Sequence, residues 1–403
     1  MTLSPSSLPD YPIVRLKPKT DSRKIRHGSP WVFDNEVVTD RRTKAMTPGT
    51  IALLQDAERR DMALVAVNPH SRIFARVLER DLTRPVDGAW IEAKLTRALA
   101  MRERLYKDPF YRLVHAEGDG LPGVVIDRFG DVAVVQPNAA WAEVLLDELA
   151  EALARVTGVT TILKNAGGRA RGLEGLDDVD AVLLGDLPDA PVPVAMNGAT
   201  YMADLTGGQK TGLFYDQRPN HAFAAGLAQG ARVLDVFSHV GGFGLACLGE
   251  GAESVLCVDG SEAALALAEE GAARSGFGAR LETRKGDAFE VLAALAEEGA
   301  KFDMVICDPP AFAPSKPALE AGLRAYERIA RLAAALVEEG GYLGLCSCSH
   351  AADLSKFRGA SLRGIGRAGR SAQLLYTGFA GPDHPMLPQL AESGYLKALM
   401  FRL

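Results

Sequence analysis

The chain has 403 residues, of which 47% are hydrophobic and 24% charged, a composition that excludes a disordered or fibrous protein. No apolar run approaches the roughly 20 residues that a membrane helix needs, and the first residues lack a signal-peptide core, so we expect a cytoplasmic protein without a membrane partner. The five cysteines form no CxxC pair, so we expect neither a metal site nor a disulfide framework. The length favours two or three domains.

The formal net charge of −6 is unevenly distributed. Residues 1–80 carry 14 Lys or Arg against 9 Asp or Glu, so the basic excess is confined to the N-terminal part. Positive charge on a small domain suits contact with RNA phosphates, and Arg23 and Lys24 are candidates for that contact. The solvated face of an ordinary β domain is the alternative interpretation.

Residues 1–82 are predicted to form a small β domain, because short strands alternate with turns rich in Pro and Gly. A linker helix over 90–106 opens a central α+β domain over 83–205, which also holds an amphipathic helix over 142–156. The strands expected in these two domains are 13–16, 50–54, 62–67, 73–77, 121–127, 132–136, 160–164 and 199–205. The Gly- and Asp-rich stretch 167–193 is expected to be a loop.

Residues 206–403 show a β-α-β-α pattern of buried strands and helices. This pattern predicts an α/β fold with a parallel, doubly wound, Rossmann-like sheet. The strands expected in it are 232–237, 254–259, 280–284, 303–307 and 342–347. Two last strands, 372–378 and 395–401, lie too close in sequence for a helical crossover and should pair antiparallel at one edge, an arrangement similar to that of class I methyltransferases.

A glycine-rich turn follows the first of these strands. Asp235 is followed by Phe237, Ser238 and Gly241, and then by a helix. Glycine lets a backbone approach a ligand closely, and the start of a helix presents free N–H groups. The spacing differs from the GxGxxG of NAD enzymes, so hydride transfer with NAD is disfavoured.

Acidic residues also close the next three strands. Asp259 ends the second, where a carboxylate accepts both ribose hydroxyls of an adenosyl group. Asp287 and Ala288 follow the third and suit the adenine edge, and Asp308 and Pro309 follow the fourth. A helix cap explains any one of these acids, but four in succession at strand ends predict a cofactor site.

The Asp-Pro-Pro turn at 308–310 should be rigid, because two prolines fix φ and remove backbone donors. Such a turn leaves Phe312 to face a flat base. The chemistry it suits is methylation of a nucleobase.

Cys346 and Cys348 alternate at the end of the fifth strand, beside the expected methyl donor. Carbon 5 of a pyrimidine is too weak a nucleophile to take a methyl group unaided, whereas addition of a thiolate to carbon 6 makes carbon 5 a carbanion. A buried structural role is the alternative for either cysteine, and is the role we expect for Cys307.

Several motifs resemble those of the RlmI-type large-subunit rRNA cytosine-5 methyltransferases, and the likeness runs nearly end to end. The motifs are GSPWVF at 28–33, EGDGLPG at 117–123, IDRFG at 126–130, GQKTGLFYDQR at 208–218, FSHVGGF at 237–243, DPPAF at 308–312, SCS at 347–349 and DHP at 383–385. Three positions depart from the family pattern, namely Ala311, His239-Val240 and His350. They bear on the choice of nucleotide rather than on the cofactor.

The resemblance implies a PUA domain, a central α+β domain and a Rossmann-like class I methyltransferase domain, with S-adenosylmethionine as cofactor and 23S rRNA as partner. It implies 5-methylcytosine as product and Cys348 as nucleophile, with Cys346 as its neighbour. The motif at 208–218 places Gln217 and Arg218 at the cofactor and Lys210 at the RNA.

Other roles follow from the mechanism. Asp308 or an ordered water is expected to take the proton from carbon 5, and His350 and His384 are candidates for lowering the thiol pKa. A methyltransferase for guanine in RNA would share the cofactor motifs without needing a cysteine. A non-catalytic RNA-binding assembly factor would keep the fold, although the intact acidic series counts against it. The sequence leaves open whether the chain forms a homodimer.

Overall fold

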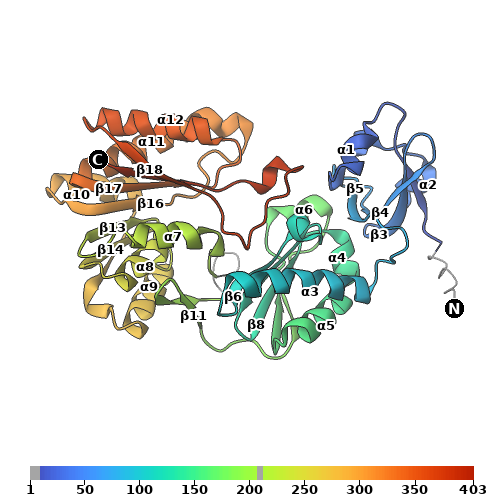
Figure 1. The fold of residues 1–403 in the computed structure, drawn as a ribbon, viewed down its shortest axis with the longest axis horizontal. Helices are drawn as coiled ribbons and strands as arrows, with labels where there is room; N and C mark the ends of the chain where they lie inside the picture. Colours follow the sequence, from blue (N-terminus) through green and yellow to red (C-terminus); the bar gives the residue numbers. More distant parts are fainter. Residues whose placement is uncertain (1–9, 207–211) are drawn as a thin grey trace. The chain divides into compact units, whose positions relative to one another are not determined.

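The computed structural model describes residues 10–206 and 212–403 (Figure 1). These residues form two compact units. The first contains the chain up to Leu187 together with Asp383–Ser393, and the second contains Pro188–Pro382 together with Gly394–Leu403. The division into three domains, with boundaries after residues 82 and 205, stays a prediction.

The first unit begins with a five-stranded sheet in the order β1-β3-β4-β5-β2. Its elements are β1 Ile13–Arg15, α1 Ser22–Arg26, β2 Trp31–Val32, α2 Arg41–Lys44, β3 Thr50–Gln55, β4 Asp61–Val67 and β5 Ala75–Glu79. β1 runs parallel to β3, and the other pairs are antiparallel. Apolar side chains from these strands, among them Val14, Leu54 and Val65, meet in one core. The four strands expected here are confirmed.

The second sheet of this unit has the order β10-β9-β8-β7-β6. Its strands are β6 Phe110–His115, β7 Val124–Phe129, β8 Val132–Pro137, β9 Thr161–Lys164 and β10 Ala181–Leu184. The helices that pack with it are α3 Gly88–Leu105, α4 Ala140–Val144 and α5 Leu146–Thr157. The single helix expected over 142–156 is divided at Leu145, and Trp90 of α3 meets Trp141 of α4 edge to face at 6.0 Å.

The stretch 167–193 is only partly a loop, so the expectation of a loop throughout is wrong. It contains α6 Arg169–Glu174 and the edge strand β10. Buried Arg171 holds the helix in place, because its Nη1 donates to Oε2 of Glu143 at 2.9 Å. Glu174 is also buried, and its carboxylate accepts hydrogen bonds from Asn68 and Ser71 in the loop after β4 and from Arg76 of β5. These partners lie far away in sequence, where local patterns cannot reveal them.

The segment 383–393 belongs to the first unit although it lies near the C-terminus. The carbonyl of Asp383 accepts a hydrogen bond from Nη2 of Arg102 at 2.7 Å, and its Oδ2 accepts from the backbone N of Arg112 at 3.1 Å. Asp383 and Arg102 are both fully buried. Since buried charged groups need such partners, the segment is an integral part of this unit.

The second unit contains a seven-stranded sheet in the order β15-β14-β13-β16-β17-β19-β18. Its strands are β13 Arg232–Val236, β14 Ser254–Asp259, β15 Leu281–Lys285, β16 Phe302–Cys307, β17 Val337–Ser347, β18 Gln373–Gly378 and β19 Lys397–Arg402. Strands β13 to β17 are parallel, and β19 is antiparallel to both β17 and β18. The Rossmann-like sheet and its antiparallel edge are confirmed.

Helices cover both faces of this sheet (Figure 1). They are α7 Arg218–Ala225, α8 Gly242–Gly249, α9 Glu262–Arg274, α10 Ala288–Glu297, α11 Leu319–Leu336 and α12 Leu354–Arg367. Helices α10, α11 and α12 share one apolar core with the sheet. A hairpin of β11 Val192–Met196 and β12 Ala199–Ala203 packs on α9 and therefore lies in this unit. We expected 199–205 in the central domain instead.

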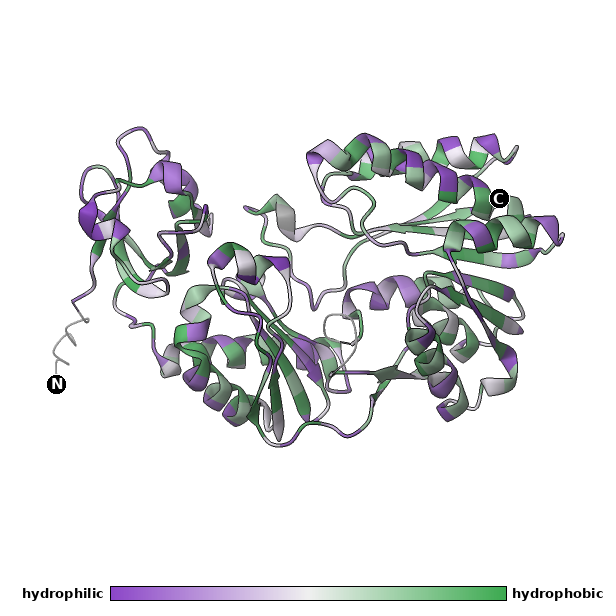
Figure 2. Ribbon diagram, turned by 180° about the vertical axis from the view of Figure 1, so that it is seen from behind, coloured by the Kyte–Doolittle hydropathy of each residue, from purple (hydrophilic) through white to green (hydrophobic). Residues whose placement is uncertain are grey.

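Apolar residues concentrate in the strands, and polar residues line the outer faces of the helices (Figure 2). Because β13 to β17 are parallel, their carboxyl ends meet at one edge, which is where open α/β sheets bind ligands. Within the two described ranges, no helix is long and apolar enough to cross a membrane.

Candidate cofactor and catalytic site

Asp235 lies at the carboxyl end of β13 and is only 1% exposed. Its Oδ2 accepts a hydrogen bond from the backbone N of Gly244 at 2.8 Å, while Oδ1 has no partner among the described residues. Burial raises the pKa of this carboxyl to about 7. Unpartnered buried polar atoms are rare in proteins, so this oxygen marks a place where a ligand group would be satisfied.

The turn between β13 and α8 has a strained backbone. Phe237 and His239 have positive φ angles of 61° and 51°, and Gly241 has one of 81°. Residues with a side chain seldom adopt this conformation, and such strain gathers at ligand sites. Ser238 lies between them with a buried Oγ that has no partner in the described part of the chain. The predicted Phe237, Ser238 and Gly241 therefore form one tight, polar turn.

Asp259 closes β14 and is tied to the same turn. Its Oδ2 accepts from the backbone N of His239 at 2.9 Å, and its Oδ1 accepts from the backbone N of Ser261 at 2.8 Å. A carboxylate offers about four acceptor sites, so the hydroxyls of a ribose can share this group.

Asp287 and Ala288 lie where β15 passes into α10. Asp287 caps that helix, because its Oδ1 accepts from the backbone N of Phe289 at 2.9 Å. The ring of Phe312 lies 6.0 Å from that of Phe289 and 6.3 Å from that of Phe237. The three rings, which come from the segments that follow β13, β15 and β16, thus form an apolar surface at the ligand-binding edge.

Asp308 follows β16 and precedes the buried Pro309. Its Oδ2 accepts a hydrogen bond from Nε2 of Gln217 at 2.9 Å. Gln217 ends a 3-10 helix that begins at Tyr215, and its Oε1 accepts from Nδ2 of Asn220 at 2.7 Å. The structure therefore brings together Gln217 and Asp308, which the sequence assigns separately.

The two cysteines of the fifth strand differ in their environments. Cys346 is 2% exposed, and burial raises the pKa of its thiol well above the ordinary value. Cys348 lies one residue beyond the end of β17 and is partly exposed. The other cysteines, Cys247, Cys257 and Cys307, are buried, as we expected for Cys307. A nucleophilic thiol must be reachable and ionised, so the geometry favours Cys348.

Two groups that hold the residues beside Cys348 were missed by sequence reasoning. The hydroxyl of Tyr326 lies 2.7 Å from Oγ of Ser349 and accepts a hydrogen bond from Oγ of Ser347 at 2.8 Å. Lys397, the first residue of β19, donates from Nζ to the carbonyl of Ser349 at 2.6 Å. The signal that could have found Lys397 is a lysine at the start of an otherwise apolar strand.

The two histidines considered for the thiol have different surroundings. The ring of His350 lies 5.7 Å from that of Tyr395. His384 belongs to the first unit, where its buried Nδ1 lies 2.9 Å from Oδ1 of Asp383. The contacts of His384 thus give it a structural place in that unit.

The remaining predicted residues belong to helices or lie outside the described residues. Arg218 begins α7, with its guanidinium 5.9 Å from the ring of Tyr215. Arg23 and Lys24 lie on α1 of the first unit, and Lys24 forms an ion pair with Glu36. Lys210 lies outside the described residues.

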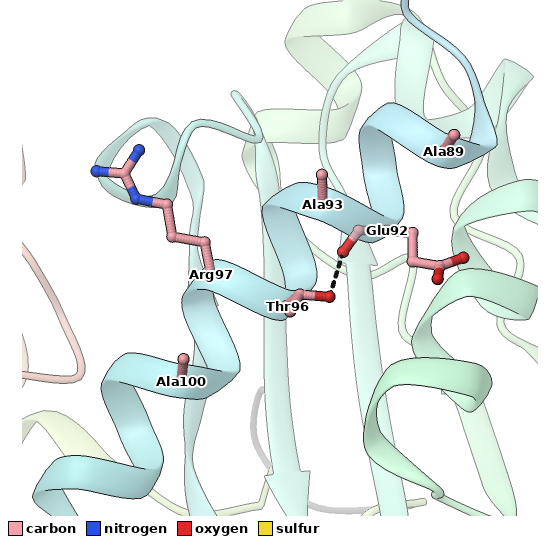
Figure 3. A pocket seen from close by; sticks show the side chains of 6 residues that line it. All are labelled: Ala89, Glu92, Ala93, Thr96, Arg97 and Ala100. Carbon is pink, nitrogen blue, oxygen red and sulfur yellow. Dashed lines mark hydrogen bonds between the residues drawn. The ribbon is translucent and has the colours of Figure 1, made fainter.

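A separate depression lies on the exposed face of α3. Figure 3 shows the side chains that line it, which are Ala89, Glu92, Ala93, Thr96, Arg97 and Ala100. The hydroxyl of Thr96 donates back to the carbonyl of Glu92 at 2.8 Å, so this hydroxyl is already engaged within the helix. Over residues 10–206 and 212–403, no group of three or more His, Cys, Asp or Glu is placed to hold a metal ion.

Residues 175–402 match the family of S-adenosylmethionine-dependent methyltransferases, and residues 14–80 match a PUA-like domain. A ribosomal RNA large subunit methyltransferase I of Salmonella arizonae is 34% identical over 406 residues, with 100% of both chains covered. The protein of the same name from Shewanella denitrificans is 33% identical over 97% of this chain and 99% of its own length. A ribosomal RNA large subunit methyltransferase of Deinococcus radiodurans is 35% identical over 97% of this chain and 98% of its own length.

Two solved structures share the fold. A SAM-dependent methyltransferase from Streptococcus mutans aligns with a TM-score of 0.80 at 18% identity, over 97% of this chain and 100% of that chain. A methyltransferase complexed with SAH aligns with a TM-score of 0.81 at 19% identity, over 97% of this chain and 99% of that chain. The likeness covers both units of the fold.

Proposed function

We infer that this chain methylates carbon 5 of a cytosine in 23S rRNA. The inference starts from its family, because the chain belongs to the S-adenosylmethionine-dependent methyltransferases, together with the ribosomal RNA large subunit methyltransferases I. The observation that carries this proposal is the position of Cys348, a reachable thiol at the sheet edge where Asp235, Asp259 and Asp308 also lie. We assign RNA contact to the PUA-like domain and place the reaction in the cytoplasm.

The residues at the strand ends fit the cofactor, which supplies an electrophilic methyl group when it is bound. Asp259 keeps acceptor sites for the ribose hydroxyls, and Phe289 and Phe312 offer apolar surface to the adenine. The unpartnered Oδ1 of Asp235 and Oγ of Ser238 suit the charged amino-acid end. The ribose, the adenine and the amino-acid end of the cofactor therefore each have a chemically matched group on this edge.

We assign the attack on the base to Cys348. Its thiolate Sγ forms a bond to carbon 6, and the electron pair of the 5,6 double bond moves to carbon 5. Carbon 5 then takes the methyl group that the bound cofactor would supply, and the electron pair of the broken carbon–sulfur bond would stay with the cofactor. A base must next remove the proton from carbon 5, so that the returning electron pair re-forms the double bond and breaks the bond from Sγ to carbon 6. Asp308, oriented by Gln217, is our candidate for this base.

RNA that carries 5-fluorocytosine at the target tests the proposal, because fluorine cannot leave carbon 5 as a proton does. Wild type, Cys346→Ala and Cys348→Ala are incubated with this RNA and separated on denaturing gels. We expect a shifted band with wild type and Cys346→Ala and none with Cys348→Ala. Calorimetry should show that Cys348→Ala still binds S-adenosylmethionine, because the thiol serves the base and not the methyl donor.

Three outcomes would change the assignment. Loss of the band only in Cys346→Ala moves the nucleophile to that residue. Full methylation by both single variants and by the double variant contradicts the covalent mechanism and favours a guanine target. Base mapping that finds no rRNA methylation dependent on this chain favours the non-catalytic assembly factor.

A further inference from the structure

Lys397 is a buried cation whose hydrogen-bond partners are neutral. It opens β19 directly opposite Ser347 of β17, and it is 5% exposed. Its Nζ donates to the carbonyl of Ser349 at 2.6 Å and to the carbonyl of Ala352 at 2.8 Å. Among the described residues, no carboxylate lies within ion-pair distance of this ammonium. A buried charge without a counter-ion is costly, so its retention calls for a reason.

The loop to which Lys397 donates these hydrogen bonds is the loop that carries Cys348. Its two acceptors lie one and four residues beyond the cysteine, and its own strand pairs with the residue just before it. Burial lowers the pKa of Lys397, while the charges of Cys348 and Asp353 oppose that shift, as they must when a cation and a thiolate are neighbours.

We infer that the ammonium of Lys397 is the counter-ion of the Cys348 thiolate, and thus a positioning residue for the nucleophile. This inference rests on the proposed role of Cys348. When the thiol ionises, the S–H bond breaks, its electron pair stays on Sγ and the proton passes to solvent, while Lys397 keeps all its protons. The cation stabilises the product of this step, so more of the thiol is in the reactive form at neutral pH.

Other titratable groups face this region from each neighbouring element. Tyr326 of α11 is a neutral phenol, because burial raises its pKa. Asp353 caps α12 at the surface and is paired with Lys356 at 2.7 Å. Asp308, after β16, carries the opposite sign and would disfavour a thiolate, and His350 follows in the same loop. Among the charged groups of these elements, Lys397 is therefore the buried cation, and a positive charge favours ionisation of the Cys348 thiol.

Alkylation kinetics of the full chain test the inference without any methyl transfer. Iodoacetamide is applied from about pH 5 to about pH 10, and modification of the Cys348 peptide is followed by mass spectrometry; Cys348 is the partly exposed cysteine and the other four are buried. We expect a midpoint below the ordinary value of about 8.5 in wild type. In Lys397→Met the midpoint should rise by about one unit or more, which lowers the rate at pH 7 about tenfold, with an unchanged plateau at high pH.

Two controls separate charge from structure. Lys397→Arg keeps a cation and should restore the midpoint, and Lys356→Met removes an exposed cation from the first turn of α12 and should leave the midpoint unchanged. A wild-type midpoint at or above about 8.5, or an equal midpoint in a Lys397→Met variant that still binds S-adenosylmethionine, overturns the inference. If instead Cys348→Ala methylates cytosine normally, the proposed function fails while the alkylation result still stands.

Discussion

Nε2 of Gln217 donates a hydrogen bond to Oδ2 of Asp308 at 2.9 Å. Asn220 donates to Oε1 of Gln217 at 2.7 Å, and the hydroxyl of Tyr376 donates to Oδ1 of Asn220 at 3.2 Å. Each side chain in this series is oriented by the next, and the series ends on the carboxylate. Asp308 is therefore oriented by a series of groups from the 3-10 helix 215–217, from α7 and from β18.

The Gln217→Ala variant should lose activity while its fold is kept. A hydrogen bond to a charged group contributes about 1.5–3 kcal/mol, so we expect kcat to fall about tenfold or more. The control is Gln229→Ala, an exposed glutamine just beyond α7, which should behave as wild type. Single-turnover methylation measures the effect. An unchanged kcat would remove Asp308 from the proton-transfer step.

Asp235→Asn should stabilise the protein at high pH. The folded pKa of Asp235 is about 7, above the ordinary value near 3.9, so its contribution to stability is present below about pH 4 and lost as pH rises to about 7. A neutral amide removes this loss, which amounts to up to about 4 kcal/mol. Urea unfolding near pH 5 and pH 8 should show a gain that grows with pH.

Two comparisons make that result specific. His221, whose pKa burial lowers to about 3, destabilises wild type and variant alike in acid, so the difference between them isolates Asp235. Asp303→Asn removes an ion pair with Arg232 at 3.1 Å and should bring no gain. We also expect weaker cofactor binding by Asp235→Asn. Equal stability of variant and wild type at pH 8 would mean that the buried carboxyl carries no penalty.

Asp259→Ala should weaken S-adenosylmethionine binding by roughly 1.5–3 kcal/mol, because the ribose loses a charge-assisted partner. Asp259 also accepts from the backbone N of His239, so part of the loss comes from the turn. Calorimetry is the measurement, with Glu262→Ala as the control, since Glu262 is exposed and pairs with Lys285. Unchanged affinity in a folded variant would place the ribose elsewhere.

Charge removal at Arg23 and Lys24 should weaken RNA binding and flatten its dependence on salt. Each lost phosphate contact lowers the slope of log affinity against log salt by about 0.7–0.9. Arg60→Gln, in the same sheet domain and paired with Asp56 at 2.8 Å, is the matched control. If affinity and slope stay the same in the double variant, α1 is only a solvated face.

Much of the catalytic sheet could be predicted from sequence because buried parallel strands are continuous apolar runs, which end where the acidic residues begin. The acids Asp235, Asp259, Asp287 and Asp308 do lie at or just after four such ends. What each one does could not be predicted. The carboxylate of Asp235 is buried under α8 and that of Asp287 caps α10, because side-chain burial depends on the packing of the whole unit.

The partners of the groups proposed as catalytic could not be predicted for a different reason. Gln217 and Asp308 are 91 positions apart, and Lys397 meets the loop of Cys348 only because β19 turns back along β17. The same holds for Arg171, whose acceptor Glu143 lies 28 positions away and turns an apparent loop into a helix. Local periodicity carries no information on such contacts.

The segment 383–393 has a consequence for synthesis on the ribosome. Residues up to Leu187 are made before Asp383, yet buried Arg102 and the backbone N of Arg112 donate hydrogen bonds to Asp383, which can form only after the segment 383–393 has been translated. Domains are generally expected to fold from the N-terminus onward. Here part of the first unit comes from the segment 383–393, so a nascent chain that stops before Asp383 lacks the acceptors for these two donors, while the guanidinium of Arg102 keeps its ion pair with Asp119 at 2.6 Å.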